Sequence, residues 1–226
     1  MAPKEKVIIH CMDCEQDGLY EMWTDINAKN DKVQKKRLLS GHLSQYICPH
    51  CHSTHFVDHP MLYHSPDHEL MVQCVMMDHD ERLALDTFQA IQDGTFGQKY
   101  ELGETYQYRV VRSLTQLREK ALIFEHDLDD KVIELMKLQI LTQLQNADPD
   151  ILIEETQIDF PSSGQIRFLV KIPENQMISI AFDQELYDMI KEKFLKKNAA
   201  SGCMDFVVNR EWAEKQMADE EWVECH

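Results

Sequence analysis

Residues 7–14 read Val-Ile-Ile-His-Cys-Met-Asp-Cys, and residues 43–51 read Leu-Ser-Gln-Tyr-Ile-Cys-Pro-His-Cys. Each segment ends in a C-x-x-C turn, and 33 residues separate the two cysteine pairs. Zinc prefers four thiolate or imidazole ligands in a tetrahedron, and two such turns supply four sulfurs. The sequence therefore predicts one structural Zn²⁺ bound by Cys11, Cys14, Cys48 and Cys51.

The segments around the cysteines either alternate between apolar and polar residues or are short apolar runs, and both patterns are typical of strands. We expect strands at 7–9 and 19–23 with a turn at 15–18, and further strands at 43–47, 55–57 and 70–76. Between the pairs, Asn30 as N-cap and Gly41 as C-cap delimit a predicted helix over 30–40. The N-terminal part is therefore expected to be a zinc-ribbon-like β unit with an inserted helix.

A helical segment should follow. Apolar spacing predicts a helix at 80–93, period-two alternation a strand at 106–110, and the capping-box pattern Ser113-x-x-Gln116 the start of another helix. The predicted helix 129–145 is apolar nearly all round, so it must be covered on most sides. Two alternatives stay open for it: it is a central core helix, or it is the seam of a homo-oligomer.

The cluster Asn146 to Asp150 marks the expected boundary between a domain at 1–146 and a C-terminal α+β lobe at 147–226. In that lobe apolar residues recur at every second position, which is the period of a β-strand. We expect an antiparallel β-meander followed by helices, with strands at 151–160, 166–172 and 177–182, a helix at 184–197, a short strand at 205–208 and a last helix from about 210. The predicted fold class is α+β.

Charge and composition limit the classes of molecule that the chain is expected to bind. The chain has 23 basic and 40 acidic residues, a formal charge of -17, and such a field repels a phosphate backbone. A basic island at 29–37 runs against this balance, and the candidate nucleic-acid contacts in it are Lys35, Lys36 and Arg37. No membrane-length apolar run or leader pattern is seen, and paired cysteines in such a chain indicate metal binding in the reducing cytoplasm.

Beyond the cysteines, several segments resemble the CpXC domain proteins of bacteria, a family named for two C-P-x-C motifs. The resemblance covers roughly residues 5–145 and is carried by Cys48-Pro49-His50-Cys51 and by the segments 23–28, 38–41, 60–66, 109–114 and 117–120, with 129–135 matching more weakly. It implies a paired-cysteine, zinc-ribbon-like unit and no particular biochemical role.

The chain departs from that family pattern at both cysteine pairs. The first pair lacks the proline, and Glu15 and His52 follow the pairs where zinc-binding turns often have glycine. The turns could therefore be wider than usual, and His52 is an alternative ligand to a cysteine.

Eight of the eleven histidines lie between His42 and His79, so a second metal site in this stretch stays open. His64 and His68 have helical ligand spacing, but Pro66 between them should break a helix. Of the remaining cysteines, Cys74 lies in an apolar strand and is expected in the core, whereas Cys203 and Cys225 have no partner motif.

The sequence contains no recognisable catalytic motif, and a zinc ion with four cysteine ligands keeps no position for substrate. An enzyme is therefore not favoured. We expect a protein-interaction or regulatory module with a protein partner; the alternatives are a nucleic-acid-binding transcriptional regulator and a metal-dependent enzyme.

Overall fold

A computed structural model describes residues 4–96, 105–161, 164–198 and 205–218. The chain forms two compact units, residues 1–122 and 123–226. The division falls within a helix, α3 (Leu114–Glu125), and not at the turn cluster 146–150 where the sequence places a domain boundary. The predicted α+β class is confirmed. No helix in the described ranges is long and apolar enough to cross a membrane.

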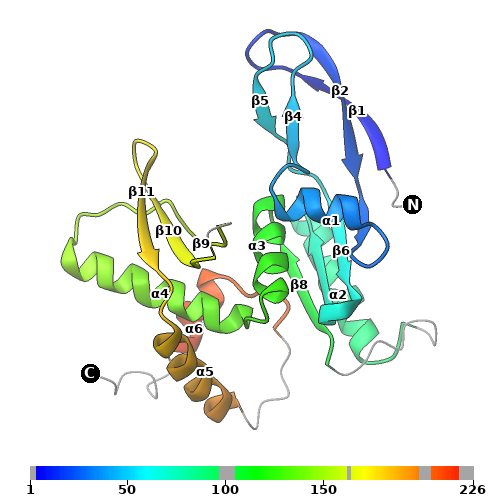
Figure 1. Cartoon of the computed structure of the whole chain (residues 1–226). Coiled ribbons are helices and arrows are strands. Elements are labelled where there is room, and N and C mark those ends of the chain that lie inside the picture. The colour runs from blue at the N-terminus through cyan, green and yellow to red at the C-terminus, as the bar shows by residue number, and fades with distance from the viewer. Residues whose placement is uncertain (1–3, 97–104, 162–163, 199–204, 219–226) are drawn as a thin grey trace. The chain divides into compact units, whose positions relative to one another are not determined.

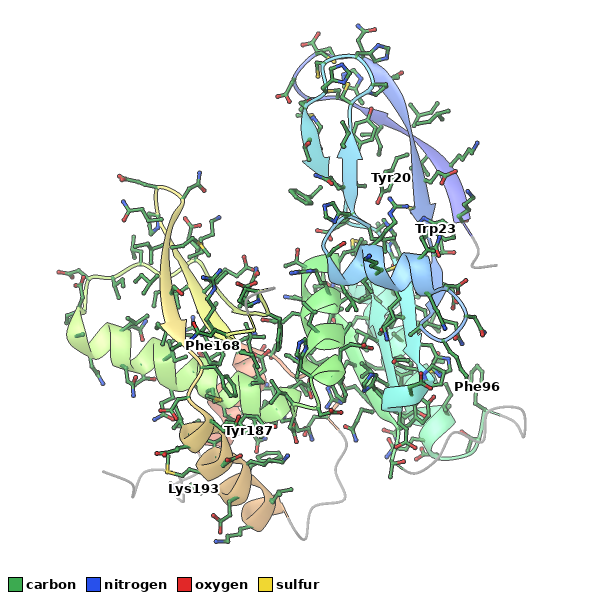
Figure 2. All side chains as sticks on the ribbon, in the orientation of Figure 1. Tyr20, Trp23, Phe96, Phe168, Tyr187 and Lys193 are labelled. Atoms are coloured by element: carbon green, nitrogen blue, oxygen red, sulfur yellow. The ribbon has the colours of Figure 1, made fainter. Side chains whose placement is uncertain are left out.

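Unit 1 begins with two β-hairpins that stand side by side (Figure 1). The first hairpin pairs β1 (Lys4–His10) with β2 (Asp17–Trp23), and the second pairs β4 (Gln45–Ile47) with β5 (Thr54–Phe56), both antiparallel. Their facing sides bury Tyr20 and Tyr46, whose rings meet edge to face at 6.3 Å, and Figure 2 labels Tyr20 between the hairpins. Two small sheets thus share one small core.

The helix α1 (Lys32–Leu39) connects the hairpins, close to the predicted 30–40. Its N-cap is Asp31 and not Asn30, because the Asn27 side chain already accepts from the backbone N–H groups of Lys29 and Asn30 in a turn before the helix. Gly41 ends the helix at φ 77°, the left-handed conformation expected of a glycine C-cap.

A four-stranded mixed sheet forms the larger core of unit 1. Its order is β3-β6-β7-β8, from β3 (Asp25–Asn27), β6 (Met61–Ser65), β7 (Leu70–Cys74) and β8 (Gln107–Val111). The β3–β6 and β7–β8 pairs are parallel, and β6–β7 is antiparallel. The strands β3 and β6 were not predicted; β3 has three residues, and its partner β6 lies more than thirty residues away in the sequence.

Between β6 and β7 the chain makes a 3₁₀ turn, η1 (Pro66–His68), so Pro66 does interrupt the helical spacing of His64 and His68. The helix α2 (Asp78–Gln92) packs Phe88 against Tyr108 of the sheet, with ring centroids 5.1 Å apart. The helix α3 begins at the predicted capping pattern, where the Gln116 N–H donates to Ser113 Oγ over 3.1 Å.

Unit 2 is built around α4 (Asp130–Ala147). A three-stranded antiparallel meander, in the order β11-β10-β9, and the helices α5 (Gln184–Asn198) and α6 (Arg210–Ala218) pack with it, and Figure 2 labels Phe168 of β10 and Tyr187 of α5 in this core. The meander strands are β9 (Glu155–Asp159), β10 (Arg167–Ile172) and β11 (Gln176–Ala181). The meander prediction is therefore confirmed, with β9 shorter than the predicted 151–160.

In unit 2 the structure favours one of the two alternatives for the helix 129–145 and corrects the strand expected at 205–208. The chain buries most of the apolar surface of α4 itself, including Val132, Ile133 and Leu135, so α4 is a core helix and not an exposed seam between copies. Residues 205–208 form no strand; they run irregularly into α6, and Val208 fills the core without a backbone ladder.

Candidate metal centre

Both cysteine pairs lie in the turns of the hairpins, which we call the first knuckle (residues 11–16) and the second knuckle (residues 48–53). The two knuckles share one hydrogen-bond pattern. In each, the backbone carbonyl of the first cysteine accepts a hydrogen bond from the N–H of the residue four positions later. The N–H of that cysteine donates to the carbonyl of the residue five positions later. The four bonds, of 2.9 to 3.0 Å, are Glu15 N–Cys11 O, Cys11 N–Gln16 O, His52 N–Cys48 O and Cys48 N–Ser53 O. The two knuckles are therefore equivalent turns.

Glu15 and His52 occupy the left-handed region in these turns, at φ 58° and 63°. A non-glycine residue adopts this conformation at a cost of about 1–2 kcal/mol. The absence of glycine therefore does not widen either turn, and strain is accepted at both. The His52 side chain is exposed and does not join the cysteine sulfurs, so the structure gives no support to His52 as a ligand.

The four sulfurs converge at the shared end of the hairpins. All four Sγ atoms lie within 4.8 Å of one another, and the separations Cys11–Cys51 and Cys14–Cys48 are both 3.6 Å. A tetrahedral zinc ion with Zn–S bonds of about 2.3 Å requires sulfurs about 3.8 Å apart. The four thiols are free and the donor set fits a metal ion of this size. Because each close pair takes one sulfur from each hairpin, a bound ion would join the two hairpins.

Hydrogen bonds, burial and the neighbouring sulfurs separate the pKa values of the cysteines. The Ser53 hydroxyl and the backbone N–H groups of the first knuckle lower the pKa of Cys11 to about 5, and backbone N–H groups of the second knuckle lower that of Cys48. The Gln16 N–H lowers the pKa of Cys14, but burial and the three neighbouring sulfurs outweigh it and raise the value to about 12. Four adjacent thiolates repel one another, so a divalent cation is the natural counter-charge for the full set.

Three side chains around the sulfurs were missed by the sequence analysis. Ser53 Oγ lies 2.9 Å from Cys51 Sγ and 3.4 Å from Cys11 Sγ, and His55 Nε2 lies 3.4 Å from Cys11 Sγ. Asp13 Oδ2 approaches the same imidazole nitrogen at 3.5 Å. The signal in the sequence was the alternation leading into β5, which turns Ser53 and His55 to the same side.

The remaining candidates from the sequence are the basic residues of α1 and the histidines. Lys35, Lys36 and Arg37 lie on α1, where Lys36 is exposed and Lys35 and Arg37 are half-buried. In the described ranges, the clusters of metal-type side chains are the four-cysteine group and the group of Cys11, Asp13 and His55.

His64 Nε2 is within 2.6 Å of the Tyr106 hydroxyl, so it makes a structural contact in the sheet region. Cys74 is buried, as predicted, and burial raises the pKa of its thiol to about 12, which makes it unreactive. Cys203 and Cys225 lie outside the described residues.

Comparison with known families supports the resemblance drawn from the sequence. The model of the family described as CpXC protein matches residues 9–137, which is more than half of the chain and includes both knuckles. No curated protein and no solved structure matches the chain. On the strength of the family match and of the clustered cysteine pairs, the chain belongs to the CpXC family.

Proposed function

We propose that the metal is zinc, that its role is structural, and that the zinc-ribbon-like hairpin pair is a protein-interaction module in the cytoplasm. The observation that carries the proposal is the convergence of two sulfurs from each hairpin within 4.8 Å. An all-sulfur tetrahedral set favours zinc over harder cations and leaves no coordination position for a substrate. Reduced, paired cysteines suit a cytoplasmic protein.

The surface that we propose for the partner is formed by the outward sides of the hairpins. Ile8 and Leu19 face each other across the first hairpin and are 70% and 69% exposed, and Ile47 and Phe56 on the second are 57% and 73% exposed. We call these four residues the outer apolar surface. Ile8 and Leu19 lie on the outward face of the first hairpin and Ile47 and Phe56 on that of the second, and exposed apolar pairs of this kind favour a protein-binding role over a solvated one. Joining the hairpins through zinc would hold the surface in one geometry.

We expect Leu19→Ser combined with Phe56→Ser to abolish co-purification of native partners while zinc content stays unchanged. The physical reason is the loss of two large apolar contacts at positions that the fold does not need. Cross-linked purification from the native cell, followed by mass spectrometry, measures this. Leu152→Ser with Leu195→Ser, two exposed leucines of unit 2, is the matched control and should keep the partners. Equal recovery with both double variants would refute the proposed surface.

For a homo-oligomer, the alternative left open by the sequence, we propose a surface other than α4, since unit 2 covers that helix itself. The outer apolar surface is the candidate that replaces it. Light scattering of the wild type and of the Leu19→Ser, Phe56→Ser variant distinguishes a second copy from a different partner, because only self-association would change the mass of the purified protein.

Binding to nucleic acid should be weak, at micromolar affinity or above in about 150 mM salt. Even if all five basic side chains of residues 29–37 contacted phosphates, the slope of log affinity against log salt would be only about -4 to -5. The surrounding charge of -17 opposes that contact. Fluorescence anisotropy with duplex DNA, single-stranded DNA and structured RNA tests this. Submicromolar binding that disappears when Lys35, Lys36 and Arg37 are changed to Glu would instead favour the nucleic-acid-binding regulator.

A further inference from the structure

The imidazole of His55 is surrounded on one side by more groups than one ring nitrogen can serve. Its Nε2 lies 3.0 Å from Ser53 Oγ, 3.4 Å from Cys11 Sγ and 3.5 Å from Asp13 Oδ2. A ring nitrogen carries a single N–H or a single lone pair, so it can satisfy one of these partners. A sulfur and a carboxylate oxygen, both common metal ligands, therefore face the same imidazole nitrogen. A cation bound between His55 Nε2, Cys11 Sγ and Asp13 Oδ2 would interact favourably with all three atoms at once.

His55 is held in this orientation by the fold. It lies on β5 opposite Tyr46 in β4, the two rings stack with centroids 6.2 Å apart, and the His55 side chain is only 23% exposed. Asp13 comes from the tip of the first knuckle and is 60% exposed, so the site faces solvent on that side. The imidazole is therefore a preorganised ligand, and the carboxylate lies where an ion could enter.

The distances suit a zinc-sized ion. Bond lengths of about 2.0–2.3 Å to nitrogen, oxygen and sulfur place tetrahedral ligands about 3.4 to 3.6 Å apart. The observed separations from His55 Nε2 are 3.4 Å to sulfur and 3.5 Å to oxygen, and all three ligand atoms lie within 4.8 Å of one another. We propose that His55, Asp13 and Cys11 bind a second divalent ion, with Cys11 Sγ bridging it to the zinc of the four-cysteine site.

Charge favours this second ion. A zinc ion with four thiolates keeps a net charge of about -2, and Asp13 adds another negative charge beside it. A second dication offsets this excess within a chain of charge -17. Three protein ligands of mixed sulfur, nitrogen and oxygen type are typical of zinc or cobalt positions that keep a water as fourth ligand. The proposal rests on the zinc site proposed above, because Cys11 belongs to both positions.

The test is metal stoichiometry of the full chain, measured by titrating Zn²⁺ in competition with a chromophoric chelator. Wild type should bind two equivalents, the second more weakly. His55→Ala and Asp13→Asn should each bind one equivalent, because each removes a ligand of the second ion only. His52→Asn is the matched control, since it replaces a histidine three residues before His55 that lies outside both ligand groups, and asparagine tolerates its left-handed backbone; it should still bind two.

The outcomes separate this proposal from the zinc site itself. One equivalent in wild type, or two in both ligand variants, overturns the second position and returns His55 to a hydrogen-bond donor for Cys11. No bound zinc at all would refute the four-cysteine site as well. If His55→Ala misfolds, the exposed Asp13→Asn decides alone. Co²⁺ gives an independent readout: the second equivalent should perturb the sulfur-to-cobalt charge-transfer band if Cys11 bridges, and should leave it unchanged if it does not.

Discussion

Replacing Cys48 with serine should remove the structural zinc and unfold both hairpins while unit 2 stays folded. Among the residues that the structure describes, the core between the hairpins is small: Cys11, Tyr20, Tyr46 and Cys48 are buried, and five further side chains are partly buried against them, so the metal should be a main link between the two sheets. Zinc contributes on the order of 10 kcal/mol to folding in small cysteine sites. Unit 2 has its own core and should not respond.

Hydrogen exchange measured by mass spectrometry resolves these regions. We expect amides of residues 4–23 and 45–56 to exchange freely in Cys48→Ser and in chelator-treated wild type, with unchanged protection in α4 and β10. Cys11→Ser should behave in the same way. Cys74→Ala is the matched control, because it changes a buried cysteine of the same unit that is remote from the metal ligands, and it should retain zinc. Slow exchange in the metal-free hairpins would mean that their own packing is sufficient.

Substitution of Gly18 by alanine should destabilise unit 1 by about 1–3 kcal/mol or more, the range of overpacked cores. Gly18 lies in β2 opposite Ile9, and a Cβ atom there would be 2.0 Å from the Tyr46 hydroxyl oxygen and 2.9 Å from Pro49 Cδ. The first hairpin can reach the second only because this position has no side chain. An added methyl group would move the hairpins apart and also weaken zinc binding.

Urea unfolding measures the loss of stability in Gly18→Ala, and competition with a zinc chelator measures the loss of zinc affinity in the same sample. Tyr46→Phe deletes the oxygen at 2.0 Å, so the double variant with Gly18→Ala should regain part of the lost stability. The recovery should be incomplete, because the Tyr46 ring carbon at 3.1 Å and Pro49 remain close. If Gly18→Ala is as stable as wild type, the hairpins do not approach as closely as the structure shows.

The sequence located the cysteines of the candidate site but not their surroundings. The C-x-x-C spacing depends on four consecutive residues, so it could be recognised without knowledge of the fold. Ser53, His55 and Asp13 carry no motif. They meet Cys11 because His55 pairs with Tyr46 and because the two knuckles face each other, and this register is a property of the paired strands.

The fold likewise has features that the sequence predicts and features that only the structure shows. The meander of unit 2, the helix 114–125 and the end of α1 at Gly41 were accessible from local patterns of alternation and capping. Of the mixed sheet only β7 and β8 were accessible in this way, because β3 has three residues and pairs with β6 across more than thirty residues of sequence. Gly18 was expected in a turn and lies in a strand, where the approach of Tyr46 accounts for the glycine.

The sequence by itself determined the features that arise from neighbouring residues: two cysteine turns able to bind one metal, an acidic charge, helices with their stops, and the α+β class. Only the tertiary structure decided that α4 is a core helix, that the chain divides within α3, and that Asp13, Ser53 and His55 surround Cys11. The physical reason is the distance along the sequence over which each interaction acts. Capping, turn strain and ligand spacing act over a few residues, whereas burial and register are sums of many weak contacts between segments that are distant in the chain and adjacent only after folding.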